Sequence, residues 1–453
     1  MNLLLSLSIL TVLDAGGSWP AGQRPQRLAQ VSGHSRGYLT TPQELELIGQ
    51  KADLGLEPYA TARDDLLAHA ADVYKENDPR APYLINIKGS DIDTPRFLPR
   101  ASRKAYALAI AYHLLKDSDP ATARKYANRA YELVMAMPWR NTQVSGYQAN
   151  TRLNLSVYTQ TFVYAADLLA DWPVPGVDNT PFYQSADNQL FKEWLGRVIF
   201  RYPYNVAHTR ANNWGAWGRL TTAVIGDYVG SDAPLYAQSF EKASTREYVP
   251  HPDYECDAGK VKNCVQIDGA EAYATALRLH FEYVDGRMVE ISGSSCDANG
   301  SKSMIRPDGG MPDELRRQYS CDATEVPDPD GAAANYSQFA TESMVALAEL
   351  AWRRGNPLLY THINPVNQRG ALYRSIAFML KNNLYLKKSS MLEMVNRFYT
   401  YQLTVERNPV KRAEFKALLE ANLPEILKQQ GNWPAGPSWI SFGTLTHGFA
   451  AGE

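Results

Sequence analysis

Two amphipathic segments joined by a short polar turn constrain the fold of this chain most. Residues 102–113 and 120–137 each repeat apolar side chains at i, i+3, i+4 and i+7, which is the period of a helix with one buried face. The turn from Lys116 to Asp119 joins them into an antiparallel hairpin. Strand patterns are sparse elsewhere, so the sequence predicts an all-α fold built from successive antiparallel helical hairpins.

The same helical pattern continues along most of the chain. Thr41, followed by Pro42 and Glu44, is typical of a capped helix start. Residues 78–99 are expected to form a long loop. The remaining helices are expected at 58–74, 155–172, 188–199, 212–228, 269–283, 335–353, 368–383, 390–405 and 409–428.

The composition is that of a globular protein with a large core. Of 453 residues, 45% are hydrophobic and 21% are charged. The formal net charge of -2 provides no basic field, so no nucleic-acid partner is expected. Beyond the N-terminus no segment is long and apolar enough to span a membrane, so no membrane partner is expected either.

The N-terminal residues have the pattern of a targeting segment. Residues 1–18 contain an apolar run of signal-peptide length followed by small residues, although no Lys or Arg precedes the run. Residues 19–40 are polar and turn-rich and are expected to form a linker. The rest, 41–453, is predicted to be a single domain. A signal peptide predicts a secreted or periplasmic protein.

All the cysteines fall in one stretch of the chain. Cys256, Cys264, Cys296 and Cys321 are even in number and clustered, which favours disulfides and an oxidising compartment. We favour Cys256 with Cys264 and Cys296 with Cys321, and the two other pairings stay open. A zinc site is not expected, because no CxxC motif or Cys/His cluster occurs. Residues of about 230–330 are therefore predicted to be an insertion stapled by disulfides.

The stretch from Arg210 to Gly218 places two carboxamides and two indoles on a predicted helix. An Asn pair lowers helix propensity, and a buried Asn needs partners for its donors and its acceptor. One interpretation is that Asn212 and Asn213 hold a substrate carboxylate. The alternative is that one Asn caps the helix while Trp214 and Trp217 fill the core.

Several motifs follow in a fixed order, and with the Asn pair they resemble the bacterial alginate lyases and their relatives. That family has an Asn-Asn-His stretch, then Asp-Gly-Ser, Glu-Leu-x-Arg, a Tyr followed by Phe-Ala, and a Gly-Val-Asp-Leu-Tyr ending. The matching residues here are Asn212-Asn213, Asp308-Gly309-Gly310, Glu314-Leu315-Arg316-Arg317, Tyr336 with Phe339-Ala340, and Gly355 to Tyr360. The resemblance covers about residues 41–385 and implies an incomplete (α/α) toroid.

Two departures from the family pattern bear on the site. Trp214 stands where the relatives carry His. An insertion containing Cys321 lengthens the spacing from Arg317 to Tyr336, which could move the arginine off the site.

The resemblance implies β-elimination on a β-1,4-linked uronic-acid polymer, such as polymannuronate or glucuronan, without a metal or cofactor. The partner is then an anionic uronate polysaccharide. Neutralising the uronate carboxylate stabilises the enolate-like transition state, and a base must take the C5 proton. By the resemblance, Tyr336 is base and acid, Asn212 or Asn213 neutralises the carboxylate, and Arg317 is the electrostatic partner, with Arg316 as the alternative. Glu314 is expected to orient Arg317 through an ion pair.

Other residues are candidates for the missing imidazole and for sugar binding. His208 lies four positions before Asn212 and is the preferred substitute. His280 and Tyr283 share a helix face and are candidates for substrate binding. Arg210 and Trp214 are further candidates for substrate contact, the indole as a sugar platform. Trp139, Asn141, Gln143 and Tyr147 are expected to lie in a loop at the rim of the cleft.

Two other classes of function stay open. A glycoside hydrolase on the same helical toroid would need two opposed carboxylates, and no pair is distinguished in the sequence. A non-catalytic helical-repeat protein that binds carbohydrate would show a fixed repeat period, which does not persist along the chain.

Overall fold

Helices make up most of the described chain. The computed structural model describes residues 34–77, 80–85, 93–144, 149–176, 179–242, 248–250, 255–257, 260–262, 264–284, 304–363, 370–382, 390–429 and 442–448. The helices are α1 (Pro42–Asp53), α2 (Tyr59–Lys75), α3 (Asp93–Leu115), α4 (Pro120–Trp139), α5 (Ala149–Leu168), α6 (Ala186–Trp194), α7 (Arg201–Thr209), α8 (Asn213–Val229), α9 (Gly269–Val284), α10 (Pro312–Leu315), α11 (Ala332–Arg353), α12 (Leu358–Thr361), α13 (Ala371–Lys381), α14 (Met391–Val405), α15 (Pro409–Gln429) and α16 (Gly443–His447). A 3₁₀ turn (Phe182–Gln184) precedes α6, and a π-helical turn (Leu195–Ile199) follows it.

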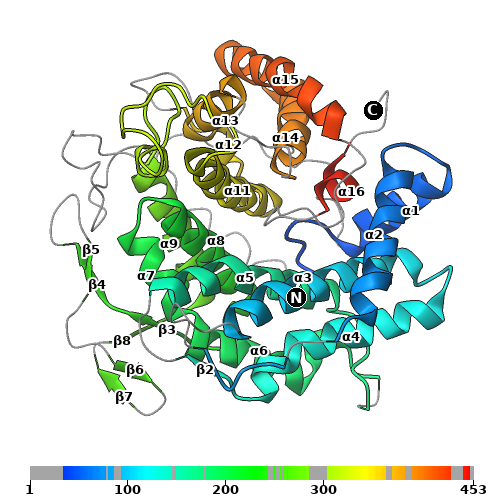
Figure 1. Ribbon diagram of the computed structural model, residues 1–453. Coiled ribbons are helices and arrows are strands. Elements are labelled where there is room, and N and C mark those ends of the chain that lie inside the picture. Colours follow the sequence, from blue (N-terminus) through cyan, green and yellow to red (C-terminus); the bar gives the residue numbers. More distant parts are fainter. Residues whose placement is uncertain are drawn as a thin grey trace.

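The strands that the structure describes are short and pair two by two. They are β1 (Leu84–Ile85), β2 (Gln143–Val144), β3 (Leu235–Gln238), β4 (Phe240–Lys242), β5 (Tyr248–Pro250), β6 (Glu255–Asp257), β7 (Lys260–Lys262) and β8 (Cys264–Ile267). β1 and β2 are parallel, whereas β3–β8, β4–β5 and β6–β7 are antiparallel. Six of the eight lie in the segment predicted to be an insertion, and in Figure 1 they project from one side of the helical body.

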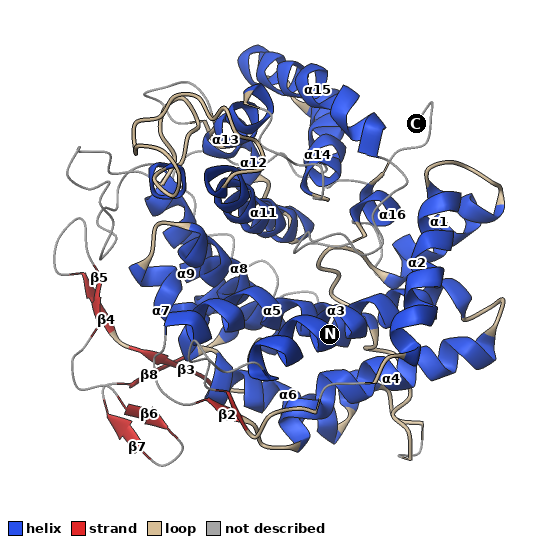
Figure 2. Cartoon of the chain, viewed as in Figure 1, coloured by secondary structure: helices blue, strands red, loops and turns tan. Residues whose placement is uncertain are grey.

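The helices follow one another around an open ring, as the toroid predicted (Figure 1). α3 packs on α4 and α5, and α8 packs on α5, α7, α9 and α11. Figure 2 shows that helices form the ring and that strands stay at its edge. Almost all residues of α8 are buried, polar ones such as Arg219 and Thr221 included, because helices pack around it on several sides.

Local capping sets the start of several helices. Thr41 and Glu44 form a reciprocal capping box at α1, and Pro42 occupies the first helical position. Asp119 caps α4 by accepting from the backbone N–H of Thr122 at 3.1 Å. These polar side chains satisfy N–H groups that a helix start leaves without partners, so the helices begin where the sequence predicts.

A buried ionic cluster joins the first helix to the last ones. The Arg353 guanidinium on α11 lies 2.9 Å from Glu44 on α1 and 2.8 Å from Glu349. Arg397 on α14 reaches the same Glu44 at 3.4 Å, and His447 on α16 lies 3.5 Å from Glu349. Two arginines therefore neutralise two carboxylates at the point where the ends of the ring meet.

The described segments correct the sequence prediction in three places. The predicted loop at 78–99 is wrong beyond residue 92, because α3 begins at Asp93 and continues through Pro99. Phe97 and Leu98 are each 1% exposed, and burial of their apolar side chains stabilises the first turns of the helix, before the predicted start at residue 102. α7 was not predicted. Residues 35–40 were assigned to the linker, yet all of them except Arg36 are buried.

The buried segment before α1 is held by one carboxylate. Asp167 on α5 accepts from the hydroxyl of Ser35 at 2.8 Å and from the backbone N–H groups of Arg36 and Gly37 at 2.7 and 2.9 Å. The predicted signal peptide at 1–18 lies outside the described residues. Among the helices described, none is long and apolar enough to cross a membrane.

Candidate active site

The start of α8 and the short helix α10 meet through two adjacent asparagines and two adjacent carboxylates. Asn212 donates from Nδ2 to Asp313 Oδ2 at 2.8 Å. Asn213 donates from its backbone N to Glu314 Oε1 at 2.6 Å and from Nδ2 to Glu314 Oε2 at 2.7 Å. These residues are 101 positions apart in the chain, and all four are buried. The Asn pair thus binds carboxylates, and those carboxylates belong to the protein.

Asn212 also caps α8. Its Oδ1 accepts from the backbone N–H of Trp214 at 3.1 Å, while its backbone is extended. The capping interpretation is therefore confirmed for Asn212. The amide nitrogen carries two hydrogens, and the bond to Asp313 uses one of them.

Burial changes the charge of this cluster. It raises the pKa of Glu314 to about 8, and the negative charge of Asp313 adds to the shift, whereas the hydrogen bonds from Asn213 oppose it. At neutral pH the protonated form of Glu314 is therefore favoured. Asp313 is then the main negative charge between α8 and α10.

Asp313 is surrounded by guanidinium groups. Its Oδ1 lies 2.6 Å from Arg316 Nε, and its Oδ2 lies 3.6 Å from Arg317 Nη2. Arg210 is near enough for the Asp313 charge to raise its pKa, although burial has the larger effect and lowers it. Three guanidinium groups against one ionised carboxylate leave the cluster positively charged. Such a cluster suits an anionic ligand.

Tyr336 lies beside this cluster on the first turns of α11. The Arg317 guanidinium lies over its ring, 4.9 Å from the ring centroid. The phenol is 38% exposed, so a ligand can reach it. The insertion before α11 therefore does not separate Arg317 from Tyr336, and the two residues meet as the motif order implied.

The ion pair expected between Glu314 and Arg317 is not the contact that the structure describes. Glu314 binds the backbone and side chain of Asn213, and Arg317 pairs with Asp313. The reason is the direction of α10. It turns Glu314 inward against α8, where that residue is 1% exposed, and leaves Arg317 at the surface.

The two indoles of the stretch have different surroundings. Trp217 is fully buried and packs 5.2 Å from Phe339, so it belongs to the core, as predicted. Trp214 is half-buried, and the Arg210 guanidinium lies 5.6 Å from its ring centroid. Of the two, Trp214 is placed at the edge of the cluster, where a sugar ring could contact it.

The candidate histidines are both buried. His208 is 3% exposed, its Nδ1 lies 2.9 Å from the carbonyl of Tyr204, and its ring stacks on Phe240 at 4.4 Å. Burial lowers the pKa of His208 to about 3. His280 is also 3% exposed and packs edge-on against Phe281. These surroundings support packing roles rather than proton transfer.

Tyr283, a candidate for sugar contact, lies in the core beneath the cluster. Its hydroxyl donates to the backbone carbonyl of His208, and its ring lies under the Arg219 guanidinium at 4.5 Å. Arg219 in turn donates to the carbonyl of Arg210 at 3.1 Å. This buried arginine was not predicted, and it supports the backbone that leads into Asn212.

The Asp308-Gly309-Gly310 motif forms a turn rather than a catalytic group. Asp308 pairs with Arg306 at 2.6 Å and accepts from the backbone N–H of Gly310 at 3.0 Å. Gly309 has φ +98, and a Cβ there would lie 2.0 Å from the carbonyl oxygen of Arg374. The motif therefore fixes the path of the chain into α10.

The sequence prediction named Asp313 only as a carboxylate that a glycoside hydrolase could use and gave it no part in the lyase site. The sequence did contain a hint of this contact. It has two adjacent asparagines and two adjacent carboxylates, and in the structure each asparagine donates to one carboxylate. Asn141 and Gln143, expected at the cleft rim, instead bond to each other at 2.9 Å, and Tyr147 lies outside the described residues.

No described cysteine is free, and the pairing of the cysteines stays a prediction because Cys296 lies outside the described residues.

Two comparisons with known proteins found a similarity to alginate lyases. The family model for alginate lyase matches residues 297–387, a segment that includes α10, Arg317 and Tyr336. A solved structure of an alginate lyase from Bacteroides ovatus is similar over 86% of this chain and 97% of that chain, at 13% identity and a TM-score of 0.48. Similarity at that level transfers no residue role. Curated proteins give no match.

The match of residues 297–387 to the alginate lyase family model supports a polysaccharide lyase. Within that class, the matched segment is similar to the alginate lyases, the family that the order of the motifs implied. Among the described residues no group of three or more His, Cys, Asp or Glu side chains is arranged to hold a metal ion.

Proposed function

We propose that the protein cleaves a β-1,4-linked uronic-acid polymer, polymannuronate in alginate or glucuronan, by β-elimination. The observation that carries this proposal is the contact between Arg317 and the exposed ring of Tyr336. An exposed phenol can reach a bound sugar, and the guanidinium beside it attracts the carboxylate of an anionic sugar. The neighbouring cluster around Asp313 supplies further positive charge for an anionic sugar.

Tyr336 acts as base and then as acid in this proposal. As phenolate it removes the proton from C5 of the uronate, and the C–H electron pair forms the C4–C5 double bond while the C4–O4 bond breaks. The departing O4 takes a proton from the Tyr336 hydroxyl, which restores the phenolate. The products are a shortened chain and a chain that carries an unsaturated uronate at its new end.

The substrate carboxylate must be neutralised for its C5 proton to be removed. We assign this role to Arg317 and to the second amide hydrogen of Asn212, with Arg210 and Arg316 contributing positive charge. Asn213 is fully buried and bound twice by Glu314, so we assign it to positioning the start of α8. Trp214 provides an apolar face for the sugar ring.

The proposal gives no histidine a part in proton transfer. His208 was the preferred substitute for the family imidazole, but its ring is buried between Tyr204 and Phe240. Its pKa of about 3 keeps it neutral at working pH. We therefore expect one residue, Tyr336, to perform both proton transfers.

A panel of uronate polymers tests the proposal. Purified protein is incubated with polymannuronate, polyguluronate and glucuronan, and the ultraviolet absorbance of the unsaturated product is followed, with and without a metal chelator. We expect absorbance to rise with one of the polymers and to be insensitive to the chelator. New reducing ends without absorbance would instead identify a glycoside hydrolase, and binding without cleavage would identify a carbohydrate-binding protein.

We also propose that the protein acts outside the cytoplasm, as a secreted or periplasmic enzyme. The support is the apolar N-terminal run at 1–18 and the clustered cysteines. Fractionation of the source cells tests this, since lyase activity confined to the cytoplasmic fraction would contradict it.

A further inference from the structure

A pocket lies on the outer side of the helical ring, away from the cluster at α8 and α10. It has a volume of about 760 Å³, and Trp139, which was expected at the rim of the catalytic cleft, lines this pocket instead. The lining comes from α4, from the start of α6 and from the segments around Ala81 and Pro175. In Figure 1, α4 and α6 lie along the lower edge of the ring, with α3 and α5 between them and α11.

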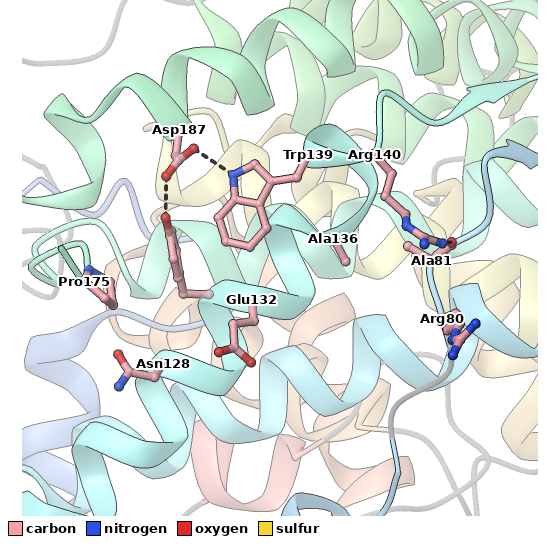
Figure 3. A pocket seen from close by; sticks show the side chains of 10 residues that line it. Arg80, Ala81, Asn128, Glu132, Ala136, Trp139, Arg140, Pro175 and Asp187 are labelled. Carbon is pink, nitrogen blue, oxygen red and sulfur yellow. Dashed lines mark hydrogen bonds between the residues drawn. The ribbon is translucent and has the colours of Figure 1, made fainter. Parts of the chain in front are cut away.

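Trp139 is the aromatic surface of this pocket. It ends α4 and is 47% exposed, which is unusual for the largest apolar side chain. Its indole N–H donates to Asp187 Oδ1 at 2.8 Å, and the hydroxyl of Tyr131 donates to the same carboxylate (Figure 3). Tyr131 also packs at right angles to the indole, 5.3 Å away. The indole is therefore held in one orientation although nearly half of it faces solvent.

The two arginines of the pocket keep their charge available. Figure 3 shows Arg80 and Arg140 toward one end, away from Asn128 and Pro175. Arg140 donates to the carbonyl of Ala81 at 2.5 Å, and its guanidinium lies over the exposed Tyr83 ring at 4.3 Å. Among the described residues neither Arg80 nor Arg140 forms an ion pair with a carboxylate. A guanidinium has five N–H groups, so Arg140 retains donors for a ligand.

The two carboxylates of the pocket are already bound by the protein. Asp187 accepts from Trp139 and Tyr131, and Glu132 pairs with Arg129 at 2.6 Å. The pocket therefore presents a fixed aromatic ring beside unpaired positive charge. A sugar ring stacks on an aromatic face, and a carboxylate binds a guanidinium through two parallel hydrogen bonds.

We propose that this pocket is a second saccharide-binding site, which holds an acidic sugar of the polymer chain outside the catalytic cluster. The sugar ring lies on Trp139, and its carboxylate faces Arg80 and Arg140. The acidic nature of the ligand rests on the proposed function, because a uronate polymer supplies that chemistry. A chain held here is kept at the enzyme surface between cleavage events, which raises its effective concentration at the catalytic cluster.

Binding to full-length protein tests the pocket. A mannuronate hexasaccharide is titrated calorimetrically into the Tyr336→Phe protein, which does not cleave it, and neutral cellohexaose serves as the uncharged comparison. We expect two binding events for the uronate. Trp139→Ala should remove one of them or weaken it at least about tenfold, since truncating a contact tryptophan removes a large share of the binding energy.

Matched variants distinguish the loss of the aromatic surface from a general effect of the substitution on the fold. Trp139→Phe loses the same bond to Asp187 as Trp139→Ala but keeps an aromatic ring, so it should retain the second binding event. Arg80→Ala changes an exposed side chain and should weaken the uronate but not cellohexaose. Unchanged uronate binding in both Trp139→Ala and Arg80→Ala would overturn the proposal, as would equal affinity for cellohexaose.

The outcomes also distinguish this proposal from the proposed function. If the wild-type protein cleaves uronate polymer while Trp139→Ala binds the hexasaccharide like its parent, the second site is wrong and the lyase stands. If no polymer is cleaved but hexasaccharide binding depends on Trp139 and Arg80, the lyase assignment is wrong and the site stands.

Discussion

The Arg317 guanidinium lies over the ring of Tyr336, 4.9 Å from its centroid, although a long insertion separates the two residues in the chain. Arg317 belongs to the segment after α10 and Tyr336 to the first turns of α11, so the insertion loops out between two fixed elements. The arginine is also 3.6 Å from Asp313, which is bound to Asn212. One arginine thus links the phenol to the start of α8.

Tyr336→Phe should abolish turnover without unfolding the protein. Removing a general acid and base lowers the rate by ~10²–10⁴-fold, and the phenol is 38% exposed, so little core packing is lost. The measurement is kcat from product absorbance, together with the unfolding midpoint. Tyr74→Phe is the control, because Tyr74 is similarly exposed at 37% and lies on α2. Near-normal turnover in Tyr336→Phe would contradict the mechanism.

Arg317→Ala should lower kcat/KM by roughly 10²–10³-fold, which is the usual loss for one group that stabilises developing charge. Arg317→Lys should recover part of this, because the charge stays but the planar contact with Tyr336 is lost. Asp313 keeps its bond to Arg316 at 2.6 Å in both variants, so the cluster should stay folded. Arg278→Ala, which removes an exposed arginine on α9, is the control and should have wild-type kinetics.

Glu314 should make the protein less stable as pH rises. Its pKa in the folded state is about 8 against an ordinary value of 4.5, so the folded state holds a proton that the unfolded chain releases. The stabilisation is complete below about pH 4.5 and is lost as pH rises to about 8, by at most ~1.4 kcal/mol per pH unit. The free energy of unfolding, measured in urea from pH 5 to 8, should therefore fall.

The difference between wild type and Glu314→Gln isolates this effect. Glu393 is also buried with a pKa raised to about 8, so it contributes a slope of the same sign in both proteins. Gln keeps a neutral side chain at position 314, and the Asn213 Oδ1, which has no described partner, can accept from its amide after a flip of Asn213. Equal slopes in the two proteins would show that Glu314 does not titrate in this range.

The same titration should affect substrate binding. Above about pH 8 the ionised Glu314 adds a second negative charge beside Asp313, which opposes an anionic sugar. KM for the uronate polymer should therefore rise above pH 8 in wild type and rise less in Glu314→Gln. Initial rates over a range of polymer concentrations, at constant ionic strength, measure this. The same dependence of KM on pH in both proteins would show that ionisation of Glu314 does not affect substrate binding.

The sequence predicted the elements whose local signals agree with their packing. α4 and α9 begin at the predicted residues and end within two positions of the prediction, because caps and apolar period coincide there. α7 was missed because Pro203 and Asn205 read as loop residues. In the fold Asn205 accepts from Arg152 at 2.7 Å and donates to Gln238 at 2.8 Å, and such distant partners cannot be inferred from local pattern.

The sequence predicted which residues belong to the site better than it predicted which of them contact each other. Motif order gave Asn212, Asn213, Arg317 and Tyr336 as neighbours of one site. It could not give the partner of each side chain, because the asparagines of α8 and the carboxylates of α10 that bind each other are 101 positions apart in the chain. The burial of His208 could not be predicted from the sequence either, because His208 packs against Phe240, a residue of β4 that is distant in the chain.

Arg353→Ala should destabilise the whole ring. The guanidinium is 6% exposed and lies 2.9 Å from Glu44 and 2.8 Å from Glu349, so its removal leaves the buried Glu349 and the partly buried Glu44 without their main partner. Breaking such a buried pair costs ~3–5 kcal/mol, measured as the free energy of unfolding in urea. Arg63→Ala is the control: its partner Asp53 is 76% exposed, so the expected loss is at most ~1 kcal/mol. Because Arg353 joins α11 to α1, a loss no larger than that of the control would mean that the ends of the ring are held by apolar packing instead.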